Sequence, residues 1–136
     1  MFKRIFIWGL TAGILSAVAS IIYQQIHEYA SYTDFRRVVS LPMIIAVNLI
    51  GSMLAALAFW ACNKLFRKNA EFIFNLILSF GTIASILYPI FYFKLPLDVP
   101  VPEMFPVLAV PMHFMPAMAW FTLRPLFAKK PFTEAN

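Results

Sequence analysis

The most restrictive feature of this 136-residue chain is four long stretches without Asp, Glu, Lys or Arg. They cover residues 5–26, 38–63, 72–93 and 104–123. An α-helix needs about 20 residues to cross a hydrocarbon layer about 30 Å thick, and each stretch has that length. We therefore expect an all-α membrane protein, a single four-helix up-down transmembrane bundle over residues 1–136 with spans near 5–26, 41–63, 72–93 and 106–126.

Composition excludes an ordinary soluble domain. Hydrophobic residues make up 62% of the chain and charged residues only 12%, whereas soluble domains carry about 25% charged residues. The net charge of +5 does not indicate a nucleic-acid partner, because the basic residues flank the spans instead of forming a folded basic face. The expected environment is therefore a lipid bilayer.

The distribution of basic residues predicts the orientation. One side of the predicted bundle holds eight of the eleven basic residues: Lys3, Arg4, Lys64, Arg67, Lys68, Arg124, Lys129 and Lys130. The other side holds Arg36, Arg37 and Lys94. Because cytoplasmic loops are enriched in Lys and Arg, both termini are expected in the cytoplasm of a bacterial cell, with the bundle in its cytoplasmic membrane.

The N-terminal segment also has features of a secretory signal. Lys3 and Arg4 precede an apolar run, and the small residues at positions 17–19 are typical of a cleavage site. The apolar run continues through Ile22 and Tyr23, however. We therefore expect an uncleaved first helix.

Small and polar residues recur every three or four positions in the first three spans. The stripes are Gly9, Gly13, Ser16 and Ser20 in the first; Asn48, Gly51, Ser52 and Ala55 in the second; and Asn75, Ser79 and Thr82 in the third. Small residues allow membrane helices to approach closely, so these faces are expected to meet inside the bundle. The Gly9–Gly13 pair favours packing within one chain, with a homo-oligomer as the alternative.

The predicted outer loops and the last span carry further signals. Asp98 and Glu103 are expected either to pair with Arg36 and Arg37 or to remain solvated. Pro111 and Pro116 interrupt the backbone hydrogen bonding of the last span, and a kink near Met112 is expected. The kink would either shape the helix packing or open a cavity beside His113.

His113 is the only ionisable side chain well inside a predicted span, at a depth of about 10 Å. A polar layer is expected at this depth, made of His113, Asn48, Ser85, Tyr88, Ser20 and Met112. Asn48 is the first expected partner of the imidazole. The layer is either a ligand-binding site, as intramembrane ionisable residues often indicate, or structural hydrogen bonding between helices.

Other chemistry is poorly supported. Cys62 is the only cysteine, and two histidines with no carboxylate in any span are too few for a zinc or di-iron site. Haem would require a second axial ligand opposite His113; His27 lies nearer the outer surface, and Met43 is a conceivable partner. Met112, Met115 and Met118 are more typical of core packing than of soft-metal transport. No metal, cofactor or catalytic group is expected.

Three segments carry a resemblance: WGLTAGILSAVASIIY, LPLDVPVPEMFP and VPMHFMPAMAWF. With them the chain resembles a group of small bacterial four-span membrane proteins of unknown function. The resemblance implies the four-span topology and places the group's signature at Met112 and His113. It implies no activity.

Two functions follow as hypotheses. The first is a non-enzymatic membrane protein that binds a partner subunit or a small lipophilic ligand in the outer half of the bundle. The alternative is a small oligomeric transporter or channel in which His113 is sensitive to protons. An enzyme is not expected, since no acid, base or nucleophile cluster is visible.

Overall fold

The structure is a computed structural model that describes residues 2–92, 94–95, 98–99 and 101–127. The regular secondary structure of this part of the chain is all helical, without a strand. Lys129 and Lys130, two of the eight basic residues expected on the cytoplasmic side, lie outside it. The elements are α1 (Phe2–Ser31), α2 (Leu41–Phe66), η1 (Arg67–Asn69), α3 (Ala70–Leu87), η2 (Tyr88–Tyr92), η3 (Pro102–Met104) and α4 (Phe105–Phe127).

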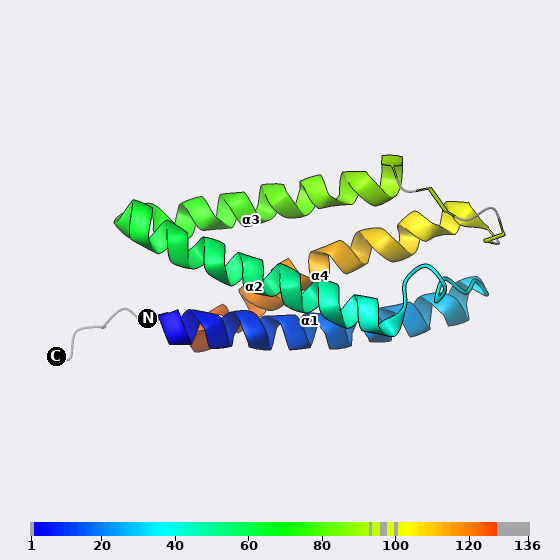
Figure 1. Ribbon diagram of the computed structural model, residues 1–136, viewed down its shortest axis with the longest axis horizontal. Coiled ribbons are helices and arrows are strands. Elements are labelled where there is room, and N and C mark those ends of the chain that lie inside the picture. The colour runs from blue at the N-terminus through cyan, green and yellow to red at the C-terminus, as the bar shows by residue number, and fades with distance from the viewer. Residues whose placement is uncertain (1, 93, 96–97, 100, 128–136) are drawn as a thin grey trace.

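Within the described residues, three helical stretches are long and apolar enough to cross a membrane: Phe2–Ser31, Leu41–Phe91 and Pro102–Phe127. The second stretch contains both α2 and α3, which fold back on each other at η1 (Figure 1). The reversal occurs where Arg67 takes a positive φ of 41°. The start of α1, η1 and the end of α4 lie at one end of the molecule, called here the η1 end, and η3 lies at the other, the η3 end (Figure 1).

Helices α1 and α2 pack closely through the predicted glycine pair. A Cβ atom on Gly9 would lie 2.6 Å from the Ala56 Cβ, and one on Gly13 would lie 2.9 Å from a Leu49 methyl carbon. The two glycines therefore allow the helix backbones to approach within a single chain. The third predicted stripe does not follow this pattern, because Ser79 on α3 is exposed.

An aromatic cluster holds the η1 end together. The rings of Trp8 and Trp120 stack with centroids 4.1 Å apart, and the Trp8 indole nitrogen donates to the Trp120 carbonyl at 3.2 Å. Phe59 and Phe74 pack edge-on within the same cluster. This cluster joins all four helices, and at the same end Arg124 of α4 forms an ion pair with Glu71 of α3.

The η3 end is covered by the segment between α1 and α2. Its Phe35 is only 1% exposed and packs against Phe105 and Leu108 of α4. Arg36 binds Glu28 at 2.7 Å; hydrogen bonding to Glu28, with its negative charge, raises the pKa of the Arg36 guanidinium. Of the two alternatives for the loop charges, pairing holds for Arg37 and Asp98, which lie 3.5 Å apart, whereas Arg36 pairs with Glu28 of α1.

Prolines shape the last two helices differently. Helix α4 remains helical through Pro111, Pro116 and Pro125. In α3 the regular helix ends at Leu87, and Pro89 lies in a π-helical turn, Tyr88–Tyr92. Because proline has no N–H to continue the ladder, a widened turn accommodates it. The third predicted span is therefore not one regular α-helix.

Candidate functional site

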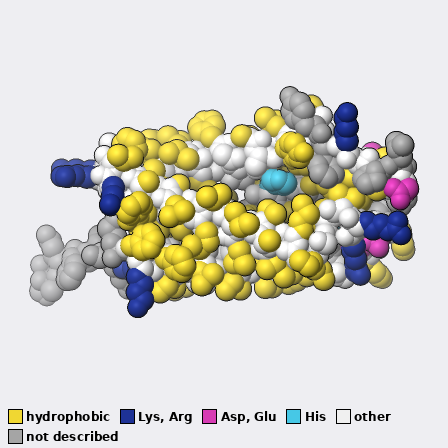
Figure 2. Space-filling view, viewed as in Figure 1, with side chains coloured by type: hydrophobic (Ala, Val, Ile, Leu, Met, Phe, Trp, Pro, Cys, Tyr) yellow, Lys and Arg dark blue, Asp and Glu magenta, His cyan; other side chains and the backbone are white. Residues whose placement is uncertain are grey.

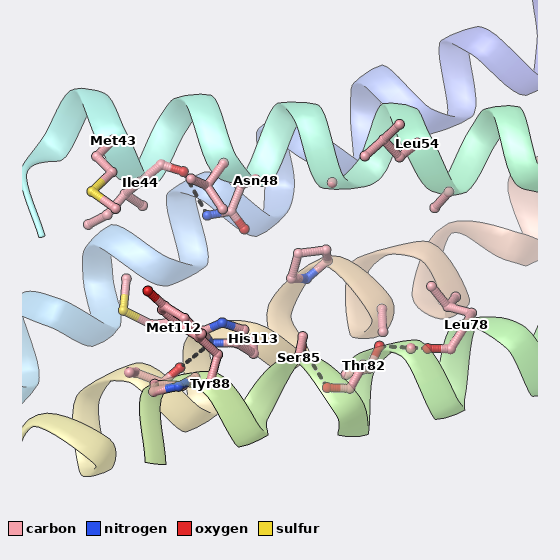
Figure 3. A pocket seen from close by; sticks show the side chains of 18 of the residues that line it. Met43, Ile44, Asn48, Leu54, Leu78, Thr82, Ser85, Tyr88, Met112 and His113 are labelled. Atoms are coloured by element: carbon pink, nitrogen blue, oxygen red, sulfur yellow. Dashed lines mark hydrogen bonds between the residues drawn. The ribbon is translucent and has the colours of Figure 1, made fainter. Parts of the chain in front are cut away.

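A pocket of about 640 Å³ lies between α2, α3 and α4. Its wall is mainly apolar, and its polar members are Asn48, Thr82, Ser85, Tyr88 and His113. Figure 3 shows that the Asn48, Ser85 and His113 side chains form a polar belt, with Met43 and Met112 on one side of it and Leu54 and Leu78 on the other. Figure 2 shows an imidazole in a hollow of the hydrophobic face of the molecule.

His113 contributes one defined hydrogen bond. Its Nδ1 lies 2.7 Å from the carbonyl oxygen of Ala109, one turn earlier on α4. A carbonyl can only accept, so Nδ1 carries the proton and Nε2 is the acceptor of the neutral ring. The prediction that Asn48 would be the first partner of the imidazole is wrong, because a helix carbonyl occupies that position.

Asn48 faces the pocket but has partners of its own. Its Nδ2 donates to the Ile44 carbonyl at 2.8 Å, and its Oδ1 accepts from the Ser20 hydroxyl at 3.5 Å. Ser20 is fully buried on α1 and does not line the pocket. Ser20 therefore contacts the polar belt only indirectly, through its hydrogen bond to the side-chain amide of Asn48.

The polar residues of α3 direct their hydroxyl hydrogens into their own helix. Thr82 donates to the Leu78 carbonyl and Ser85 to the Thr82 carbonyl, each at 2.7 Å. The lone pairs of both oxygens remain available. Tyr88 and Met112 also line the pocket. Of the six predicted site residues, five line one pocket and Ser20 is a step removed.

Two glycines in the pocket wall were not predicted as site residues. A Cβ atom added to Gly51 or Gly81 would meet nothing within 4 Å, and both residues line the pocket. Gly51 was assigned to a packing stripe, because spacing alone does not distinguish a glycine in a helix contact from one that borders open space.

Sequence reasoning also missed a second buried polar group on α1. His27, which was considered only for its depth near the outer end of its span, is 5% exposed and packs against Phe35, and Gln24 is fully buried. The Gln24 Nε2 donates to the Val39 carbonyl at 2.9 Å, while Gln24 Oε1 and His27 Nε2 have no hydrogen-bond partner among the described residues. Their spacing continues the Gly9–Ser20 stripe, and that signal could have found them.

The chemistry available in the pocket is that of a neutral site. None of the described residues that line it is Asp, Glu, Lys or Arg. Nor do three His, Cys, Asp or Glu side chains come together as a metal site in the part of the chain that is described. Comparisons with protein-family models, curated proteins and solved structures gave no match to this chain.

Proposed function

We propose that this protein is a membrane protein that binds a small lipophilic ligand in the pocket between α2, α3 and α4. The observation that carries the proposal is the coincidence of the pocket with the polar belt around His113. The volume of about 640 Å³ lies within the range of about 300–1,000 Å³ typical of small-molecule sites. Those sites likewise combine an apolar wall with a few polar groups that orient the ligand.

The two glycines of the pocket wall favour the interpretation that the pocket holds a ligand over the interpretation that it is a packing defect. Unfilled space forfeits dispersion contacts, and glycine within a helix is less favourable than alanine by about 1 kcal/mol. Alanine at Gly51 or Gly81 would add dispersion contacts and favour the helix, and its methyl group would clash with nothing. The pocket is therefore wider than packing and helix stability alone would favour, and the extra space suits a lipophilic ligand.

The proposal includes a membrane frame of four crossings, α1 to α4, with both ends in the cytoplasm. Lys and Arg side chains gather at the two ends of the molecule, with hydrophobic side chains between them (Figure 2). The described basic residues of the η1 end are Lys3, Arg4, Lys64, Arg67, Lys68 and Arg124, against Arg36, Arg37 and Lys94 toward the η3 end. This imbalance favours a cytoplasmic η1 end.

Single cysteines test this frame. In a Cys62→Ala background, Tyr29→Cys and Lys68→Cys would each place an exposed thiol at one end of the molecule. A membrane-impermeant maleimide should modify Tyr29→Cys in intact cells and Lys68→Cys only after permeabilisation. The opposite pattern would reverse the orientation, and modification of both thiols in intact cells would contradict the four crossings.

Native mass spectrometry of protein purified from its own membranes tests the ligand. The wild type should carry a lipophilic molecule of defined mass. Gly51→Phe should lose it, because the added ring points into open space within the pocket, and Gly51→Ala should retain it as the matched control. Absence of any defined adduct on the wild type, or the same adduct on Gly51→Phe, would contradict the proposal.

A further inference from the structure

The hydrogen-bonding groups of the pocket wall define what a ligand must offer. Resting on the proposed function above, we infer that the polar group of the ligand is an uncharged hydroxyl, as in a long-chain or polyprenyl alcohol. The inference follows from three properties of the belt: its acceptors, its remaining donor and its lack of charge.

Acceptors predominate on the α3 and α4 side. The His113 Nδ1–H is bound to the Ala109 carbonyl at 2.7 Å, which leaves Nε2 as a lone-pair acceptor. The hydroxyl hydrogens of Thr82 and Ser85 are likewise bound to carbonyls of α3. Each oxygen therefore faces a ligand only as an acceptor. A ligand placed there needs a hydrogen to donate.

A donor is provided on the α2 side. Asn48 uses one Nδ2 hydrogen for the Ile44 carbonyl, and its Oδ1 accepts from Ser20. An amide nitrogen carries two hydrogens, so one remains. A hydroxyl both donates one hydrogen and accepts others, so it matches the acceptor of His113 and the donor of Asn48. An ether or ketone has no hydrogen to donate and cannot satisfy the acceptor of His113.

The lack of charged side chains in the described part of the pocket wall disfavours an ionised ligand. No Lys or Arg lines the described pocket wall to neutralise a phosphate or carboxylate, and no Asp or Glu lines it to neutralise an amine. An unpaired charge in an apolar site is strongly disfavoured. The acceptor-rich wall would in addition repel an anionic headgroup.

The apolar end of the pocket indicates where the chain of the alcohol lies. Beyond the belt, Leu54, Ala58, Phe74 and Ile77 form the wall toward the η1 end. This wall ends at Phe74, which belongs to the aromatic cluster that includes Trp8 and Trp120. The hydroxyl would occupy the belt and the hydrocarbon would run toward that cluster.

Defined ligands of matched chain length test the inference. Delipidated protein in detergent is titrated with oleyl alcohol, oleyl methyl ether or oleate, and the bound fraction is measured by native mass spectrometry. The wild type should bind the alcohol about five- to tenfold more tightly than the ether, as the loss of one hydrogen bond implies. It should bind oleate more weakly than the alcohol.

Variants identify the groups responsible. Ser85→Ala and His113→Leu should each reduce the preference for alcohol over ether, whereas Ser79→Ala, an exposed serine of α3 outside the pocket, should leave it unchanged. Equal binding of alcohol and ether, or tighter binding of oleate, would overturn the inference of a hydroxyl. Loss of lipid binding in Gly51→Phe would in that case still support the pocket as the binding site. If Gly51→Phe binds all three lipids as the wild type does, the proposed function itself fails.

Discussion

The hydroxyl of Tyr23 on α1 donates a 2.7 Å hydrogen bond to the carbonyl oxygen of Val107 on α4. That carbonyl lies four residues before Pro111, which has no N–H to offer it. In lipid an unsatisfied carbonyl is disfavoured, and a neighbouring helix commonly supplies the missing donor. Tyr23 thus stabilises α4 just before the turn that carries Met112 and His113.

Removing the hydroxyl of Tyr23 should weaken this contact. We expect Tyr23→Phe to lower the stability of the purified protein by about 1 kcal/mol, the value of one hydrogen bond between helices. Thermal unfolding in a single detergent measures the change. The matched control is Tyr29→Phe, since Tyr29 is 84% exposed. Equal midpoints for Tyr23→Phe and the wild type would show that the bond contributes nothing.

The same small substitution should have opposite effects at two glycines. Gly9→Ala would place a methyl group 2.6 Å from the Ala56 Cβ and should destabilise the protein by about 1–3 kcal/mol, as overpacking does. Gly81→Ala meets nothing within 4 Å and should stabilise α3 by up to about 1 kcal/mol. Chemical denaturation of both variants decides this. Destabilisation of similar size at both positions would contradict the assignment of Gly81 to open space.

The aromatic cluster of the η1 end should depend on Trp8. Trp8→Phe removes the indole donor to Trp120 and shrinks the stacked surface, and it should reduce stability by about 1–3 kcal/mol. Trp60 is partly exposed and lies beside Lys64 at 4.2 Å. Trp60→Phe is therefore the control and should shift the unfolding midpoint much less. A larger effect at Trp60 would place the main core contact elsewhere.

Two ion pairs near the η3 end should differ in importance. Arg36 donates to Glu28 through Nε and Nη2 at 2.7–3.1 Å, and Glu28 is only 14% exposed. Glu28→Gln should loosen the segment that carries Phe35, and proteolysis of that segment should become faster. Added salt screens the ion pair of the wild type, so it should reduce the difference in proteolysis rate between the variant and the wild type. Asp98→Asn should have no effect, because the Arg37 and Asp98 side chains are 89% and 70% exposed. Equal sensitivity of the two variants would refute this distinction.

The sequence predicted features that a single physical constraint determines. Helices had to form where no charge occurs over the width of a bilayer, and the described chain is helical over most of each such stretch. Gly9 and Gly13 were expected to face a close neighbour, because small residues at this spacing allow membrane helices to approach. Counting residues to equal depth also brought Asn48, Ser85, Tyr88 and His113 together, because antiparallel helices of similar length keep residues of equal depth level.

The sequence could not predict which of several possible hydrogen-bond or packing partners a side chain contacts. His113 binds the Ala109 carbonyl on its own helix instead of Asn48, and residue depth gives no information about which acceptor is nearer. Ser79 is exposed because α3 does not pack against its neighbours along its full length. His27 is buried because Phe35 covers it, a contact that depends on how the segment after α1 folds back.

The location of the bound alcohol tests the central claim most directly. A diazirine analogue of oleyl alcohol is added to the protein in bilayers, irradiated and mapped by peptide mass spectrometry. Adducts should concentrate at pocket residues such as Asn48, Ser85 and Met112, decrease with excess oleyl alcohol and disappear in Gly51→Phe. Adducts spread over the outward face of α1, where Ile14 and Ile22 are 54% and 55% exposed, and unchanged in Gly51→Phe would contradict a ligand pocket between α2, α3 and α4.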